Sequence, residues 1–257
     1  MPRPFIAGNW KMNMLLRDAE ILVMELHEQL NGMDLSVEVA IAPPFTALRH
    51  LSHLISNSPI KLCAQDMFWE KEGAYTGEIS PLMLIDVGCQ YVIVGHSERR
   101  QYLCESDEIV NKKVISAVKH GLRPIMCVGE SIYDRENGNT LSIIKKQVEK
   151  GLAGVLKDEI KDVVVAYEPV WAIGTGKTAT PKQAEEVHNF IRNLLCEIFG
   201  LNAVKETRIL YGGSVKPDNI DTLMAEPNID GALVGGASLD AKDFARIVRF
   251  EKTGGSK

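Results

Sequence analysis

The chain has 257 residues, of which 45% are hydrophobic and 25% are charged, and its formal net charge is −5. This composition is typical of a globular protein with a substantial core and argues against a disordered chain. The acidic balance argues against nucleic acid or an anionic membrane as a partner, because both require a basic face. No apolar run approaches the roughly 20 residues that span a bilayer, and residues 1–13 lack the long apolar core of a signal peptide, so we expect a cytoplasmic protein.

The five cysteines are scattered and form no C-x-x-C pair: Cys63, Cys89, Cys104, Cys127 and Cys196. Neither a disulfide framework nor a zinc cluster fits this pattern. Small buried hydrophobic side chains are the favoured interpretation over reactive thiols.

Short β-rich runs alternate with segments of helical spacing along the whole chain. The runs are PFIAGNW (4–10), VEVAIAP (37–43), IKLCAQD (60–66), YVIVGH (91–96), RPIMCVG (123–129), DVVVAYEP (162–169), RILYGGS (208–214) and GALVGGA (231–237). Helical spacing is clearest over 15–30, 107–120 and 181–199, and each segment is followed by a glycine suited to end a helix: Gly32, Gly121 and Gly200.

This alternation predicts an α/β fold in which helices cover a parallel sheet, and eight such units close a (β/α)8 barrel. An open doubly wound sheet is the alternative, but no Gly-rich dinucleotide fingerprint follows the first strand and no linker divides the chain. We therefore expect a single barrel domain over residues 1–257. In either architecture the carboxyl ends of the strands carry the functional site.

Polar residues and glycines follow five of the predicted strands at this edge: Asn9, Lys11, His96, Glu168, Ser214, Gly235 and Gly236. They bring together one cation, one imidazole, one carboxylate and a set of backbone donors. Such an inventory suits proton transfer on an anionic substrate.

Glu168 is the candidate general base, because it emerges at the end of an apolar strand and is followed by Pro169. A solvated loop acid is the ordinary alternative for a glutamate. Cover by the apolar Val170, Trp171 and Ile173 would remove water from the carboxylate and raise its pKa towards the range useful for a base.

His96 and Lys11 are the candidate electrophile and cation. His96 precedes what resembles a capped first turn of a helix, and a helix start disfavours a charged imidazole, so a neutral His96 could donate to a developing oxyanion. A core histidine and a surface lysine are the ordinary alternatives. At an effective dielectric near 20, a cation about 4 Å from an anion gains on the order of 4 kcal/mol.

The string GTGKT at 174–178 resembles a nucleotide-binding loop only superficially, because Trp171 stands where such a loop requires glycine. Its glycines are better suited to lid motion and one backbone contact. Ser214 and the Gly235–Gly236 pair follow the seventh and eighth strands, where barrels frequently bind phosphate through backbone amides.

Five motifs resemble the triosephosphate isomerase family in content and order, over essentially the full length of the chain. They are AGNWKMN (7–13), GHSERR (95–100), AYEPVWAIGTGKTAT (166–180), YGGSV (211–215) and VGGASL (234–239). The resemblance implies a TIM barrel that interconverts dihydroxyacetone phosphate and D-glyceraldehyde 3-phosphate in glycolysis and gluconeogenesis, with neither metal nor organic cofactor.

The resemblance also implies roles for individual residues. Glu168 would be the base and neutral His96 the electrophile, Lys11 and Asn9 would support the charged intermediate, and Glu98 would assist. The backbone at four positions would hold the phosphate: Gly174, Ser214, Gly235 and Gly236. Residues 169–180 would close as a lid that excludes water.

The loop at 64–78 resembles the family's dimer loop, with Thr76 near its tip expected to reach Lys11 and His96 of the partner subunit. A homodimer is therefore expected. Leu103 and Cys104 stand where many relatives carry Phe-Gly, and an accessible Cys104 would be sensitive to oxidation.

Two further interpretations remain open at the level of sequence. Another phosphosugar barrel would need either a desolvated Schiff-base lysine, for which Lys11 is the candidate, or clustered metal ligands. The second interpretation is a non-catalytic protein that uses only the surface of the barrel for binding.

Overall fold

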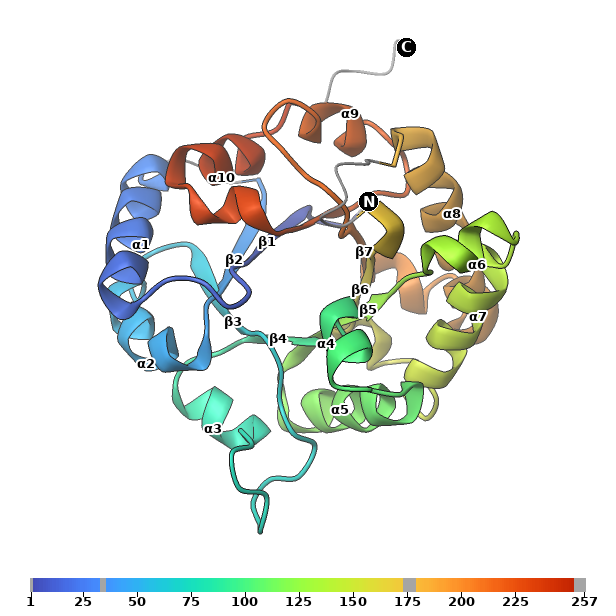
Figure 1. Cartoon of the computed structure of the whole chain (residues 1–257), viewed down its shortest axis with the longest axis horizontal. Helices are drawn as coiled ribbons and strands as arrows, with labels where there is room; N and C mark the ends of the chain where they lie inside the picture. The colour runs from blue at the N-terminus through green and yellow to red at the C-terminus, as the bar shows by residue number, and fades with distance from the viewer. Residues whose placement is uncertain (1, 33–35, 173–178, 252–257) are drawn as a thin grey trace.

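The computed structural model describes residues 2–32, 36–172 and 179–251. Eight parallel strands hydrogen-bond in sequence order and close into a barrel, which Figure 1 shows end-on with helices around it. The strands are β1 (Phe5–Asn9), β2 (Glu38–Ala42), β3 (Ile60–Ala64), β4 (Tyr91–Val94), β5 (Arg123–Val128), β6 (Val164–Tyr167), β7 (Arg208–Tyr211) and β8 (Gly231–Val234). The predicted (β/α)8 barrel is thus confirmed.

Closure of the barrel is visible in the register of β1. Phe5 lies opposite Glu38 of β2 on one side and opposite Gly231 of β8 on the other. The backbone comes so close at Gly231 that a Cβ there would lie 1.9 Å from the Phe5 carbonyl oxygen. Glycine at this position is therefore required by the contact that seals the sheet.

Side chains alternate between two apolar layers along each strand. Phe5 and Ala7 of β1 point into a core inside the barrel, whereas Ile6 belongs to the larger core between the strands and the helices. Because both faces are buried, the strands are almost continuously apolar, which is why they are recognisable in the sequence.

The outer layer consists of helices that connect successive strands. They are α1 (Leu16–Leu30), α2 (Phe45–Leu54), α3 (Pro81–Asp86), α4 (Ser97–Tyr102), α5 (Asp107–His120), α6 (Ile132–Glu136), α7 (Thr140–Gly151), α8 (Pro181–Phe199), α9 (Ile220–Met224) and α10 (Ala241–Val248). Short 3-10 turns accompany them at η1 (Ile160–Asp162), η2 (Val170–Ala172), η3 (Ala203–Glu206) and η4 (Gly236–Leu239). None of the helices in the described segments is long and apolar enough to cross a membrane.

The predicted bounds of α5 and α8 are confirmed. The Ser106 hydroxyl caps α5, and Gly121 follows it in the left-handed conformation at φ 84°. Thr180 and Gln183 form a capping box at the start of α8, and Gly200 follows at φ 87°. Helix α1 begins one residue later than expected, at Leu16.

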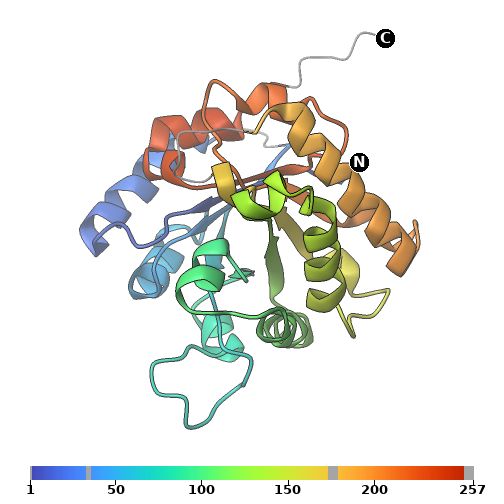
Figure 2. The same cartoon turned by 45° about the vertical axis from the view of Figure 1, so that its right-hand side comes forward.

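The loop between β3 and α3 stands away from the barrel in both cartoon views (Figures 1 and 2). Its own aromatic side chains hold it together: Phe68 stacks on Trp69 at 3.9 Å and contacts Tyr75 at 4.4 Å between ring centroids. The Lys112 ammonium lies over the Trp69 ring at 4.9 Å, and Ser116 donates to the Trp69 carbonyl. The protruding loop is therefore anchored on α5.

The cysteines lie largely as expected. Cys63, Cys89 and Cys127 are buried, and burial raises the pKa of each of their thiols. Cys104 is exposed and has a positive φ of 55°, a backbone conformation that favours glycine. Its thiol is accessible in this chain.

Candidate active site

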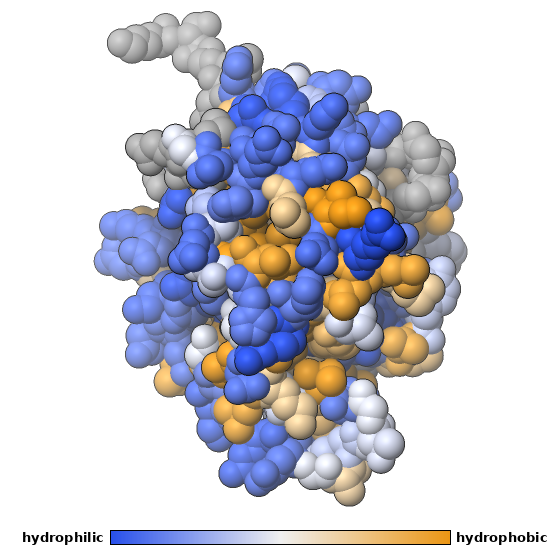
Figure 3. All heavy atoms as spheres, turned by 90° about the vertical axis from the view of Figure 1, so that its left-hand side faces the viewer, coloured by the Kyte–Doolittle hydropathy of each residue, from blue (hydrophilic) through white to orange (hydrophobic). Residues whose placement is uncertain are grey.

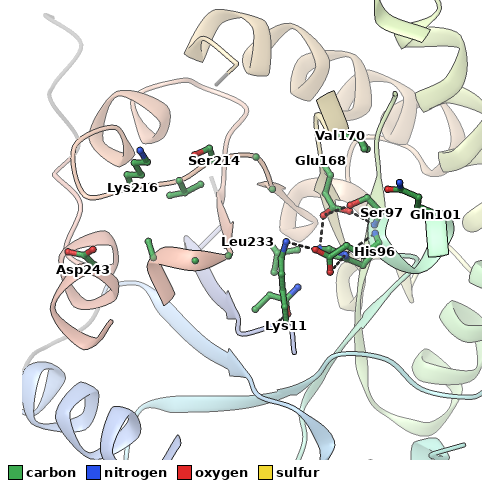
Figure 4. Close-up of a pocket in the computed structure, with 18 of the residues that line it drawn as sticks. Lys11, His96, Ser97, Gln101, Glu168, Val170, Ser214, Lys216, Leu233 and Asp243 are labelled. Carbon is green, nitrogen blue, oxygen red and sulfur yellow. Dashed lines mark hydrogen bonds and ion pairs between the residues drawn. The ribbon is translucent and has the colours of Figure 1, made fainter. Parts of the chain in front are cut away.

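A pocket of about 650 Å³ opens at the carboxyl ends of the strands (Figure 4). The predicted site residues within the described segments all line it: Asn9, Lys11, His96, Glu168, Ser214, Gly235 and Gly236. Gly174 lies outside the described residues. Residues from five strand ends, far apart in the sequence, therefore meet at one mouth.

Glu168 is buried and held by α4. Its Oε2 accepts the Ser97 backbone N–H at 2.9 Å, and its Oε1 lies 3.4 Å from the Ser97 hydroxyl and 2.9 Å from Nε2 of His96. Burial alone would raise the pKa of Glu168, but His96, the Ser97 N–H and Lys11 outweigh it and lower the pKa below its usual value. In this arrangement the carboxylate is ionised, which differs from the raised pKa expected under an apolar cover.

Two glycines make room for Glu168. A Cβ at Gly129 would lie 1.8 Å from the Glu168 carbonyl oxygen, and one at Gly212 would lie 2.9 Å from the Glu168 Cγ. The backbone of Glu168 also donates to the Val128 carbonyl at 2.8 Å. The strand ends of β5 and β7 thus fix where the carboxylate emerges.

His96 occupies the N-cap position of α4 and is buried. Its Nδ1 accepts the backbone N–H of Glu98 at 3.3 Å, so Nε2 is the nitrogen that donates to Glu168. Burial lowers the pKa of His96, but the adjacent Glu168 carboxylate outweighs burial and raises the pKa above its usual value. The charge state of this imidazole therefore depends on where the Glu168 carboxylate lies.

Lys11 enters the pocket from the loop after β1 in a sparsely populated backbone conformation, at φ 54°. Three contacts hold it there: its N–H donates to Asn9 Oδ1 at 3.0 Å, its carbonyl accepts from Gln65 at 2.8 Å, and its ammonium donates to Glu98 at 2.6 Å. A strained backbone conformation that several neighbouring contacts hold in place is typical of functional positions. Figure 4 shows this ammonium turned towards Glu168 and His96.

The wall of the pocket across from Glu168 consists largely of backbone that side chains leave uncovered. Ser214 and Lys216 lie across from Glu168 in Figure 4, together with the loop after β8. A Cβ at Gly236 would meet nothing within 4 Å, and one at Gly235 would only touch Lys11 at 3.6 Å. This wall therefore offers space and backbone amides to an anionic group.

Only the two ends of the proposed lid can be described. Val170 lines the pocket, whereas the Trp171 indole donates to Glu130 at 2.9 Å. Tyr167 also donates to Glu130, at 3.1 Å, and Arg135 lies over the Trp171 ring at 4.7 Å. Ile173 and most of the remaining lid lie outside the described residues.

Two residues that hold the site in place were given no role from the sequence: Ser97, which binds Glu168, and the fully buried Glu130, which binds Tyr167 and Trp171. Ser97 stands next to His96 in the GHSERR motif, but its bond to Glu168 joins residues 71 positions apart. Glu130 follows Gly129 at the carboxyl end of an apolar strand. This position, which pointed to Glu168 and His96, could also have pointed to Glu130.

The chain matches known proteins over nearly its whole length. A family model described as triosephosphate isomerase matches residues 4–251. Relatives named triosephosphate isomerase include those of Thermoanaerobacter pseudethanolicus, 57% identical over 250 residues, and Moorella thermoacetica, 54% identical over 252 residues. A third, from Citrifermentans bemidjiense, is 52% identical over 252 residues. These alignments cover 97–98% of the chain and 100% of each relative. The chain is therefore an enzyme that belongs to the triosephosphate isomerase family.

Proposed function

We propose that this protein interconverts dihydroxyacetone phosphate and D-glyceraldehyde 3-phosphate, in glycolysis and gluconeogenesis, through an enediolate. The observation that carries the chemistry is the contact between Glu168 and His96, which face Lys11 across one pocket. Base, electrophile and cation are thus within reach of one small anionic substrate.

In the forward direction Glu168 removes a proton from the carbon next to the substrate carbonyl. The electron pair of that C–H bond forms the carbon–carbon double bond, and the carbonyl oxygen becomes the enediolate oxygen. The hydroxyl proton of the first carbon then moves to the enediolate oxygen of the second carbon. The proton held by Glu168 returns to the second carbon as the first carbon becomes the new carbonyl. No group is gained or lost, and the carbonyl itself acidifies the proton, so the proposed steps use neither metal nor organic cofactor.

To reach that carbon, Glu168 must leave its bonds to Ser97 and His96. Its departure removes the larger of the two carboxylate effects that raise the pKa of His96. Glu98 still raises the pKa, whereas burial, Lys11 and the start of α4 lower it. His96 therefore becomes a neutral donor when the base engages substrate. Its Nε2–H is then free to polarise the substrate carbonyl.

Lys11 and Asn9 support the intermediate. The Lys11 ammonium bonds to Glu98, and a substrate anion would compete for it with an interaction on the order of 4 kcal/mol at an effective dielectric near 20. Asn9 is buried, and its Oδ1 accepts the Lys11 N–H. This bond fixes the backbone from which the cation projects.

The phosphate is proposed to bind at the open backbone wall, through Ser214, Gly235, Gly236 and, from the lid, Gly174. Closure of residues 169–180 would then exclude water and protect the enediolate. The contacts of Trp171 and Tyr167 with Glu130 support a defined position for the amino-terminal end of this lid.

A homodimer is proposed from the surface around the protruding loop. Large apolar side chains are exposed on this side of the molecule, including Met12, Leu15, Phe45, Tyr75 and Met83. Figure 3 shows apolar side chains gathered on the side that bears α1 and α2. A cavity of about 450 Å³ beside Met12 and Leu15 offers a place for the loop tip at Thr76 of the partner subunit. We further propose a single domain and a cytoplasmic location.

The experiment that tests this function is an assay coupled to a dehydrogenase specific for each triose phosphate. Purified protein in excess EDTA should isomerise both substrates. Reactions that start from either substrate should reach the same equilibrium mixture. Absence of turnover in both directions would contradict the proposal.

A further inference from the structure

A second cavity of about 890 Å³ lies at the opposite end of the barrel from the active site, at the amino ends of the strands. It is lined by Pro2, Arg3, Glu38, Arg123, Lys161, Asp162, Lys205, Glu206 and Arg208. Glu38, Arg123 and Arg208 are the first residues of β2, β5 and β7. The walls are thus set by the barrel and not by one loop.

The charge of this cavity is opposite to that of the chain. Five of its lining side chains are cationic and three are carboxylates, a local balance of +2, whereas the whole chain carries −5. A cavity that gathers positive charge on an acidic protein concentrates anions at one place.

Part of this charge is rigidly held. The buried Arg208 donates to Glu38 at 2.5 Å and to the Tyr91 hydroxyl at 2.8 Å, and its guanidinium lies 4.6 Å from the centre of the Phe5 ring. Burial raises the pKa of Glu38, but Arg208 outweighs it and keeps the carboxylate ionised. Arg123 donates to the same hydroxyl at 3.3 Å. The buried guanidinium of Arg208 therefore forms a fixed floor of the cavity, with the more exposed guanidinium of Arg123 beside it.

The rim supplies the cations that remain available. Lys161 in η1 and Lys205 in η3 are exposed, and neither pairs with a carboxylate of the described residues. Glu38 and Asp162, by contrast, already face Arg208 and Arg123, at 2.5 Å and 3.6 Å. The net charge that remains after these two pairs comes from Arg3, Lys161 and Lys205 against the carboxylate of Glu206.

We infer that this cavity binds a small anion with two or more negative charges of the phosphate type. Phosphate oxygens accept several charge-assisted hydrogen bonds at once, which suits flexible ammonium groups around a fixed guanidinium group. The site lies across the barrel from the catalytic pocket and shares no lining residue with it. Both can therefore be occupied together, and the ligand stabilises the fold by binding the native state.

Titration calorimetry with inorganic diphosphate tests this inference. The protein is first saturated with 2-phosphoglycolate to fill the catalytic pocket, in EDTA and at ionic strength fixed with KCl. The double variant Lys161→Ala/Lys205→Ala should bind diphosphate about tenfold more weakly, because each exposed charge contributes modestly. The matched control Lys146→Ala/Lys182→Ala removes two exposed helical lysines elsewhere and should change affinity less than about twofold.

A third variant tests the sign of the effect. Glu206→Gln removes a rim carboxylate and should tighten diphosphate binding by about twofold or more. Isomerase activity should be unchanged in all of these variants, so a failure here is distinct from a failure of the proposed function. No saturable binding to the phosphoglycolate-saturated protein would overturn the inference, as would equal losses in the two double variants.

Discussion

Nε2 of His96 lies 2.9 Å from Oε1 of Glu168, so the proposed electrophile and the proposed base hold one another in the resting site. The contact lowers the pKa of the carboxylate against the effect of burial and raises the pKa of the imidazole. Substrate must separate the two groups before either can act. Binding and the protonation states required for chemistry are therefore coupled.

Replacement of His96 by Gln should move the acid limb of the pH profile of kcat/KM to higher pH. His96 is the main group that opposes the effect of burial on Glu168, so its loss raises the pKa of the base in the free enzyme. The rate should also fall by about 10² to 10³-fold through the lost electrophile. Rates measured between pH 5 and 9 give both numbers.

Ser97→Ala is the matched control for that shift. It removes only a hydroxyl 3.4 Å from Glu168 and leaves the backbone donor at 2.9 Å. Its acid limb should move less than that of His96→Gln. An unmoved limb in His96→Gln would show that the two residues are not electrostatically coupled in solution.

A methyl group added at Gly212 should impair catalysis while the barrel stays folded. The new Cβ would lie 2.9 Å from the Glu168 Cγ, a contact that the flexible carboxylate side chain can relieve only by moving. We expect Gly212→Ala to lower kcat at least about tenfold, since small misplacements of a reacting group are costly. At Gly129 a Cβ would meet the Glu168 backbone at 1.8 Å, so Gly129→Ala should instead lower the melting temperature. Wild-type kcat in Gly212→Ala would contradict the packing described.

Buried His188 should make the protein less stable as the pH falls. Burial lowers its pKa to about 3, whereas an unfolded histidine titrates near 6.5. Its stabilising contribution is complete above about pH 6.5 and is lost as the pH falls towards 3, because the unfolded state binds the additional proton. Between pH 6.5 and 5 the free energy of unfolding should drop by about 2 kcal/mol through this group.

The variant His188→Asn isolates this effect, since Asn does not titrate but can still donate to the Asn228 carbonyl, which lies 3.2 Å from the His188 Nδ1. Urea unfolding of both proteins at pH 7.5 and pH 5 measures it. The variant should lose about 2 kcal/mol less than the wild type over this interval. Equal losses would show that His188 is not responsible.

Charge placed on the apolar surface near the protruding loop should weaken the proposed homodimer. Met83 in α3 is 53% exposed, and Leu201, which follows α8 across the barrel from α3 in Figure 1, is 67% exposed. Sedimentation should therefore show dissociation of Met83→Lys at concentrations where Leu201→Lys remains dimeric. Identical behaviour of the two variants would contradict an interface at this surface.

Much of the fold could be predicted because the strands are buried on both faces and two of the long helices, α5 and α8, are followed by a glycine. The bounds of α5 and α8 follow directly from Ser106, Gly121, Thr180 and Gly200. The pocket could be anticipated for a related reason: parallel strands bring their carboxyl ends to one edge, so Glu168 and His96 must approach each other.

The details of the site could not be predicted in the same way. The direction of the Glu168 pKa shift depends on a backbone N–H and an imidazole supplied by α4, not on the apolar residues that follow it in the sequence. The bonds of Tyr167 and Trp171 to Glu130 likewise join the end of β6 and the turn η2 to the loop after β5. Local pattern carries no information about such contacts.

The most direct test of the central claim is the turnover of Glu168→Gln alongside its binding of 2-phosphoglycolate. Glutamine keeps the shape and hydrogen-bonding reach of the side chain but cannot accept the substrate proton, so kcat should fall by at least about 10² to 10⁴-fold. Calorimetry should still detect binding of the analogue, which shows that the pocket is intact. Turnover at the wild-type rate in a variant that binds the analogue would contradict the assignment of Glu168 as the base.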